Sequence, residues 1–153
     1  MLSATFKMQY DQCRKDYNAL SFEQDVNLRG LESIKARMTC KQSQAEQEAT
    51  AQWNGTYDAY ISQGLSESDA KKATRQSIGC SSDSLSNYIK EVQANERRDA
   101  DYRQLAAYEQ LYETRKDTID QELEDLENEM KVFQEQHTKG IQEQTTFACF
   151  GGG

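Results

Sequence analysis

The chain has 153 residues, of which 36% are hydrophobic and 29% charged, and it contains no proline. Its hydrophobic content lies below the roughly 45–50% of a typical globular domain, so elongated helical structures with thin cores are favoured over a compact globule. The net charge of -8 is opposite in sign to that of most nucleic-acid-binding surfaces, and no run of about 18 apolar residues predicts a transmembrane helix.

Residues 1–50 are predicted to form one long amphipathic helix. Apolar side chains recur in this segment alternately four and three residues apart, and this spacing places them on one side of a helix that can pack against another helix. The first residues lack the apolar core of a cleaved signal peptide, so we expect a cytoplasmic protein or one exported without such a signal. The stripe contains Phe6, Tyr10, Cys13, Tyr17, Leu20, Leu31, Ile34, Met38 and Ala45.

Two polar residues, Gln24 and Asn27, occupy the same heptad frame. Polar residues in a helical seam lower stability but can fix register and partner number. Alternatively, the stripe drifts around the helix and Val26 and Leu28 replace them on the packed side. The sequence leaves both interpretations open.

Residues 51–83 are predicted to be a middle region of turns and short helices. Trp53-Asn54-Gly55 predicts a turn, because Asn-Gly is a strong turn signal. Gly64 ends a short helical segment, and Ser66 is a suitable N-cap for a second one, with its side-chain oxygen accepting from the amide of Asp69. This second helix is expected to stop near Gly79.

A second long helix is predicted over residues 84–140, capped by Ser81–Ser84 and starting near Leu85. Its polar stretch Asn95–Asp101 changes the phase of the stripe. Two long helices with one apolar seam each predict an all-α fold, an antiparallel coiled-coil-like hairpin with short helices between. Residues 141–153 are predicted to be a flexible, glycine-ended tail. The second stripe contains Tyr102, Leu105, Tyr112, Ile119, Leu123, Leu126, Met130, Phe133 and His137.

Acidic residues concentrate in the second long helix. The segment from Asp117 to Glu129 has seven acidic side chains and no basic one. Such a run is typical of a solvated helix face, and it could also be a docking face for a basic partner or a divalent ion.

No catalytic or metal-binding pattern stands out. The four cysteines form no C-x-x-C pair, and there is a single histidine, so a zinc site is not expected. We expect reduced thiols, although the sequence is also compatible with a disulfide between Cys40 and Cys80. The sequence also lacks phosphate-binding and hydrolase motifs, so we expect no enzyme activity and no cofactor.

Trp53-Asn54-Gly55, followed by Tyr57 and Ala59-Tyr60, resembles the W-x-G turn of the small secreted helical-hairpin proteins of type VII secretion. In that family the turn joins two antiparallel helices, and the protein is an exported partner or effector. The resemblance implies such a role for this chain.

The segment from Gly79 to Lys90 resembles the turn and recognition helix of a helix-turn-helix protein. The likeness implies that Ser82, Asp83, Ser86 and Asn87 would read bases. Alternatively, the glycine ends one helix and the following residues cap a new helix. The segment 66–98 has six basic and five acidic side chains, so its positive electrostatic potential is weak for a DNA-binding unit. We therefore do not expect nucleic acid as a partner.

The main hypothesis is a non-enzymatic structural protein that associates with itself, or with another helical protein, through its seams. Assembly into a filament or another oligomer is expected because a thin hairpin cannot fully bury two matched seams alone. The architecture, though no motif, is similar to that of subunits of bacterial secreted filaments, such as type III secretion filaments and flagellins. The residues expected to carry self-association are Phe6, Tyr10, Tyr17, Leu31, Leu105, Tyr112, Ile119, Leu126 and Phe133.

Overall fold

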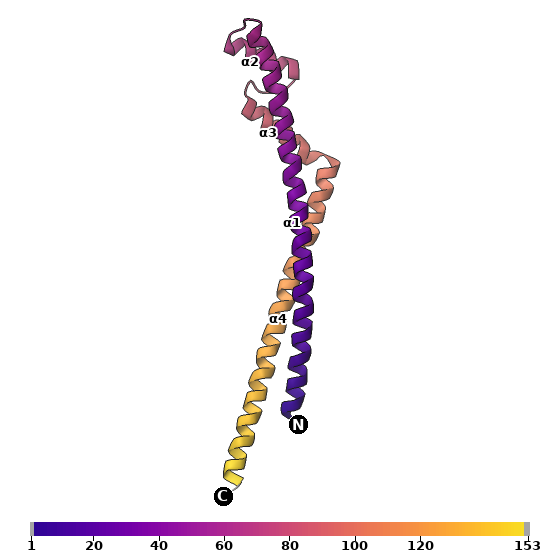
Figure 1. The fold of residues 1–153 in the computed structure, drawn as a ribbon, viewed down its shortest axis with the longest axis vertical. Helices are drawn as coiled ribbons and strands as arrows, with labels where there is room; N and C mark the ends of the chain where they lie inside the picture. The colour runs from indigo at the N-terminus through magenta and orange to yellow at the C-terminus, as the bar shows by residue number, and fades with distance from the viewer. Residues whose placement is uncertain (1, 152–153) are drawn as a thin grey trace. The chain divides into compact units, whose positions relative to one another are not determined.

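The computed structural model describes the backbone of residues 2–151 and the side chains of residues 4–142. Every regular element among these residues is an α-helix: α1 (Leu2–Ser62), α2 (Glu67–Ile78), α3 (Leu85–Arg98) and α4 (Ala100–Gly151) (Figure 1). The predicted all-α class is confirmed, and the two long helices pack together as the two stripes predict.

The chain divides into two compact units, which are described separately. The terminal unit comprises Met1–Leu31 and Leu111–Gly153, and the central unit comprises Glu32–Gln110. In the terminal unit, Cys13 of α1 contacts Glu129 of α4, Gln24 contacts Asp120, and Asn27 contacts Tyr112. The residue numbers thus increase along α1 while those of their partners decrease along α4. The two helices are therefore antiparallel in this unit.

The core of the terminal unit is thin. Its least exposed positions on both helices are the predicted stripe positions, because each helix turns one side toward the other. Cys13, Leu31 and Ile119 are buried together with the polar Gln24 and Asn27, whereas the other apolar stripe residues of this unit are half-buried. A pair of helices leaves the two flanks of its seam partly open to solvent.

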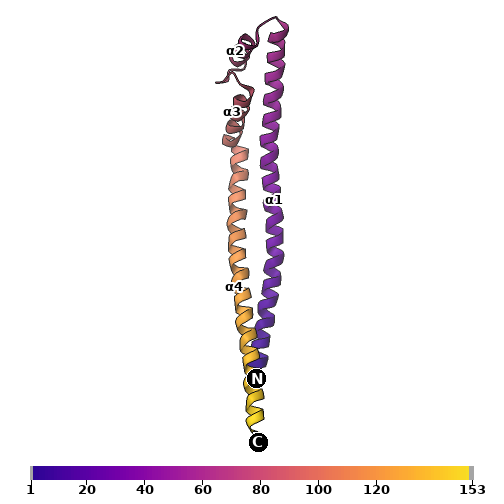
Figure 2. The ribbon, with the colours of Figure 1, turned by 90° about the vertical axis from the view of Figure 1, so that its left-hand side faces the viewer.

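The central unit has a compact aromatic core. Figure 2 shows α2 and α3 beside the C-terminal part of α1. Ala49, Trp53 and Tyr88 are buried together, with the two aromatic ring centroids 5.8 Å apart. The Tyr88 hydroxyl donates to Gln52 Oε1 over 2.7 Å, which satisfies its polar end. Partly buried residues around this core are Tyr57, Ile78, Cys80, Leu85, Ile89 and Val92.

The predicted turn at Trp53 and Gly55 is wrong. Both residues lie inside α1, which continues beyond residue 50 to Ser62. An Asn-Gly pair lowers helix stability by about 1–2 kcal/mol in all, but a helical backbone places Trp53 on the same face as Ala49 and buries its indole against Tyr88. Burial of a large aromatic side chain contributes about 1.5–3 kcal/mol, enough to offset the poor propensity.

The predicted ends of the short helix are confirmed. α1 is followed by Gly64 at φ 94°, and the Ser66 side chain accepts from the Asp69 amide over 3.2 Å at the start of α2. α2 ends at Gly79 with φ 83°, in the left-handed region that favours glycine. Ser84 is the N-cap of α3, although its side chain makes no capping hydrogen bond.

The predicted helix over residues 84–140 is divided in two. Asp99 has an extended conformation, with φ -64° and ψ 144°, and separates α3 from α4 within the polar stretch Asn95–Asp101. α4 also continues past residue 140 to Gly151, where a flexible tail is predicted. The side chains of that segment from residue 143 onward, including the phenylalanines and Cys149, lie outside the described residues.

Candidate interaction surface

Gln24 and Asn27 form a buried polar layer in the terminal unit. They are 6% and 4% exposed, whereas Val26 is 53% exposed. Gln24 Nε2 donates to the Lys116 carbonyl oxygen over 3.0 Å and to Asp120 Oδ1 over 2.7 Å. Asn27 Nδ2 donates to the Tyr112 carbonyl oxygen over 3.1 Å. The heptad positions that face α4 therefore continue through Gln24 and Asn27, and Val26 does not replace them on the packed side.

Each of these amides leaves one group unsatisfied. Gln24 Oε1 and Asn27 Oδ1 are buried and have no hydrogen-bond partner among the described residues. A buried acceptor without a partner costs about 1–3 kcal/mol. The layer thus lowers stability. Its hydrogen bonds to Lys116, Asp120 and Tyr112 favour the observed register of the two helices, as polar residues in a helical seam can do.

Gly30 allows α1 and Tyr112 to approach closely. A Cβ atom on Gly30 would lie 2.6 Å from Tyr112 Cε1, closer than real carbon atoms come. The ring of Tyr112 therefore covers the glycine, and its carbonyl accepts from Asn27 one turn away. The glycine that weakens the helix by propensity is needed here for packing between helices.

Cys13 is the buried stripe residue nearest the N-terminus. Its thiol donates to Glu129 Oε2 over 3.4 Å. Burial raises the pKa of the Cys13 thiol, and the hydrogen bond to Glu129 and the negative charges of Glu129 and Asp16 raise it further. The thiol is therefore neutral at physiological pH, which makes it a packing residue and a poor nucleophile.

Two hollows lie along the seam of the terminal unit. The first, which we call the acidic hollow, has a volume of 480 Å³ and is lined by Asp16, Ala19, Leu20, Glu122, Asp125, Leu126 and Glu129. The second, which we call the aromatic hollow, has a volume of 320 Å³ and is lined by Phe6, Lys7, Tyr10, Asp11, Phe133, Gln134 and His137. Both have apolar floors made of half-buried stripe residues.

The predicted seam residues fall into two groups. Leu31 and Ile119 are buried, and the other seven are half-buried: Phe6, Tyr10, Tyr17, Leu105, Tyr112, Leu126 and Phe133. Leu105 belongs to the central unit and the rest to the terminal unit. Sequence periodicity did not indicate which acids share a hollow, because that depends on how α1 and α4 face each other.

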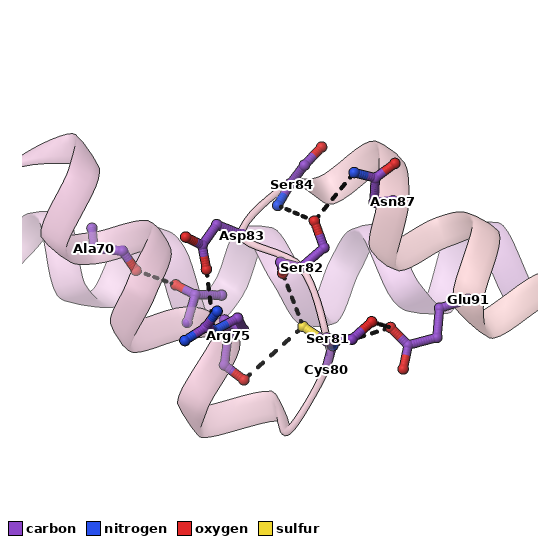
Figure 3. A network of polar contacts seen from close by, with 10 residues as sticks. Ala70, Arg75, Cys80, Ser81, Ser82, Asp83, Ser84, Asn87 and Glu91 are labelled. Carbon is purple, nitrogen blue, oxygen red and sulfur yellow. Dashed lines mark hydrogen bonds and ion pairs between the residues drawn. The ribbon is translucent and has the colours of Figure 1, made fainter.

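Ser82 and Asp83, which the helix-turn-helix likeness would make base-reading residues, are engaged within the chain (Figure 3). Ser82 Oγ accepts from the Ser84 amide and from Asn87 Nδ2, each over 3.2 Å. Asp83 pairs with Arg75 over 3.2 Å. These contacts support the interpretation of this segment as a loop that ends α2 and starts α3.

Beside this loop, the Ser81 amide and hydroxyl both donate to Glu91 Oε2, over 3.2 and 3.0 Å. Cys80 Sγ contacts the Ser82 carbonyl oxygen over 3.4 Å. Burial raises the pKa of the Tyr88 hydroxyl, and negative charge at Cys80 and Glu91 adds to the shift. Cys13, Cys40 and Cys80 are not in disulfides, so the bridge between Cys40 and Cys80 is not formed.

Among the described residues, no three His, Cys, Asp or Glu side chains come together in a way that could hold a metal ion. None of the helices, over the residues described, has a stretch apolar and long enough to cross a bilayer. No protein-family model, curated protein or solved structure matches the chain.

Proposed function

We propose that this chain is a non-enzymatic structural protein that associates with itself through the seam of its terminal unit and forms an oligomer or filament. The observation that carries the proposal is the half-buried state of the seam. Several of its apolar residues are only half-buried. Phe6, Tyr10 and Phe133 line the aromatic hollow and Leu126 lines the acidic hollow, whereas Tyr17 lies outside both.

Exposed apolar surface of this kind favours association. Burial of apolar area contributes about 25 cal/mol per Å², and a third or fourth helix laid along an open seam completes a bundle. Coiled-coil-like packing between copies is part of the same proposal, since the stripe positions repeat at the spacing that such packing requires.

The two alternatives have less support. A secreted helical-hairpin effector fits the antiparallel pair of long helices, but the turn that carried the resemblance lies within α1. A DNA-binding role would use Ser82 and Asp83, whose side chains make contacts within the chain.

The test is molar mass by light scattering across a concentration series of the purified, reduced chain. We expect the mass to rise with concentration, and we expect Leu126→Glu to abolish that rise, because a carboxylate would replace apolar surface on the floor of the acidic hollow. A wild-type mass that stays at one monomer throughout would contradict the proposal.

Met8→Glu is the matched control. Met8 is 73% exposed, lies outside both hollows and is not adjacent in sequence to a stripe residue, so a comparable change should leave the mass unaffected. Helix content of both variants is measured by circular dichroism, so that a loss of assembly is separated from a loss of fold.

A further inference from the structure

The two hollows of the terminal unit lie on opposite flanks of the seam. In the acidic hollow, Ala19 and Asp125 directly precede the stripe residues Leu20 and Leu126. In the aromatic hollow, Lys7 and Gln134 directly follow the stripe residues Phe6 and Phe133. Since successive helical residues are about 100° apart, the residues before and after a stripe position point to opposite sides of it.

The ion pair between Arg115 and Glu23 supports this geometry. Glu23 directly precedes Gln24 of the stripe on α1, and Arg115 directly precedes Lys116 on α4. Their contact places the residues that precede stripe positions of both helices on one flank, as expected for an antiparallel pair. The acidic hollow lies along that flank, and the aromatic hollow lies along the other.

The two hollows differ in charge. The acidic hollow has four carboxylates and no basic side chain in its lining. The aromatic flank has Lys7 in its hollow, and Arg14 and Lys131 follow the stripe residues Cys13 and Met130 on the same side. Asp11 and Glu127 are the acids on that side at this level, and Glu127 lies 3.9 Å from Lys131. Bases thus outnumber acids by one at this end of the aromatic flank. The rest of that flank is acidic, since the other charged residues of the terminal unit that directly follow stripe positions are Asp25, Glu113, Asp117, Asp120 and Glu124.

We propose that the acidic hollow of one copy docks on the aromatic hollow of a second copy and on the bases beside it. This inference rests on the proposed self-association and names its interface. Lys7 and Arg14 of one copy would meet the carboxylates of Asp16, Glu122, Asp125 and Glu129 of the next. The aromatic side chains of Phe6, Tyr10 and Phe133 would cover the apolar floor formed by Ala19, Leu20 and Leu126.

Charge opposes a twofold contact between two acidic hollows. Two acidic flanks brought face to face would place eight carboxylates together, and like charges across an interface oppose association. A contact between different flanks is heterologous, so each copy keeps one unused flank of each kind. Such contacts repeat without closing, or close into a ring, and an open chain of them is a filament.

The test is charge reversal on each flank, measured by sedimentation equilibrium and light scattering. The variant Glu122→Lys/Asp125→Lys reverses two exposed acids of the acidic hollow, and Lys7→Glu/Arg14→Glu reverses two exposed bases of the aromatic flank. We expect each to weaken association by about tenfold or more. An equimolar mixture of the two variants is expected to associate about as strongly as the wild type, because each reversed flank then finds a complementary one.

The matched control for the acid reversal is Glu46→Lys/Glu48→Lys, which makes the same change in net charge at exposed acids of the central unit. It should associate within about threefold of the wild type. Reversals that act no more strongly than this control, in a wild type that does associate, would overturn the interface and leave self-association standing. Weakened variants that stay separate when mixed would overturn the heterologous contact, and a wild type that is monomeric throughout would overturn both proposals.

Discussion

At the scale of single residues, Gly30 and Tyr112 explain how the two helices of the terminal unit approach each other. Tyr112 contributes a backbone carbonyl to Asn27 and a ring that lies over Gly30. A glycine within a helix costs about 1 kcal/mol relative to alanine. Here the absence of a side chain makes room for the ring, so propensity and packing act in opposite directions.

A double-mutant cycle separates these two effects. We expect Gly30→Ala to lower the free energy of unfolding by about 1 kcal/mol, because the methyl group displaces the Tyr112 ring. In the Tyr112→Ala background the same change should raise it by about 0.5–1 kcal/mol, because only helix propensity remains. Urea unfolding followed by circular dichroism measures all four chains, and a stabilising Gly30→Ala in the wild-type background would refute the close contact.

Cys13 and Cys40 are expected to differ in thiol reactivity. Cys13 is buried, and its raised pKa leaves little thiolate at pH 8, whereas Cys40 is exposed. Iodoacetamide should therefore modify Cys40 faster by about tenfold or more. Peptide mass spectrometry at timed intervals gives both rates, with the urea-unfolded chain as the control in which the two cysteines become similar. Equal rates in the folded protein would contradict the burial of Cys13.

At the scale of helices, the sequence predicted some ends and missed others for physical reasons. Gly64 and Gly79 end helices at positive φ, a backbone conformation that glycine adopts readily, and both were predicted. Gly55 carries an equally strong turn signal but lies inside α1. Gly55 stays helical because of tertiary packing, since the neighbouring Trp53 packs against Tyr88 of another helix. Local sequence signals carry no information about that contact.

Alanine substitution of two glycines distinguishes a helix interior from a helix end. A Cβ atom on Gly55 would meet no atom within 4 Å apart from its chain neighbours and the adjacent backbone of its own helix, so Gly55→Ala should stabilise the chain by about 0.5–1 kcal/mol. Gly64 has φ 94°, so Gly64→Ala should destabilise it by about 1–2 kcal/mol. Thermal melting measures both changes. Destabilisation by Gly55→Ala would restore the predicted turn and weaken the assignment of α1 through this segment.

The polar layer is the main feature of the seam that the sequence left open. The heptad frame marked Gln24 and Asn27, but only the structure shows that both are buried and bonded to α4. Periodicity gives the packed side of each helix, whereas the partner of each side chain depends on the register between helices. For the same reason the sequence shows the acidic run from Asp117 to Glu129, but it does not show how that run is divided between the acidic hollow and the opposite flank.

Replacing the layer by leucine should raise stability and lower specificity. Gln24→Leu/Asn27→Leu removes two buried amide oxygens without partners and adds apolar area, so we expect stabilisation by about 1–3 kcal/mol. Loss of the donors that fix register should allow additional oligomeric states at the same concentration. Melting and sedimentation velocity are the measurements. A lower melting temperature would show that the existing hydrogen bonds outweigh the two unsatisfied oxygens.

At the scale of the whole molecule, the distribution of charge bears on both folding and the proposed assembly. Residues 1–31 and 111–153 hold fourteen acidic and eight basic side chains, so the terminal unit carries six of the eight net negative charges. Within one chain, Asp16 shares a hollow with Glu122, Asp125 and Glu129, and these like charges repel. Between copies, the proposed interface sets the same carboxylates against bases.

Salt should therefore affect folding and assembly in opposite directions. Raising ionic strength from 0.05 to 1 M shortens the screening length to about 3 Å, which weakens repulsion within the acidic hollow and attraction between copies. At protein concentrations where the chain is monomeric, we expect the melting temperature to rise with added KCl. At higher concentrations the average molar mass should fall over the same salt range. In the Glu122→Lys/Asp125→Lys variant both trends should become smaller, because two of the four repelling carboxylates are replaced by bases. A melting temperature and a molar mass that both rise with salt would mean that apolar contacts alone hold the copies together.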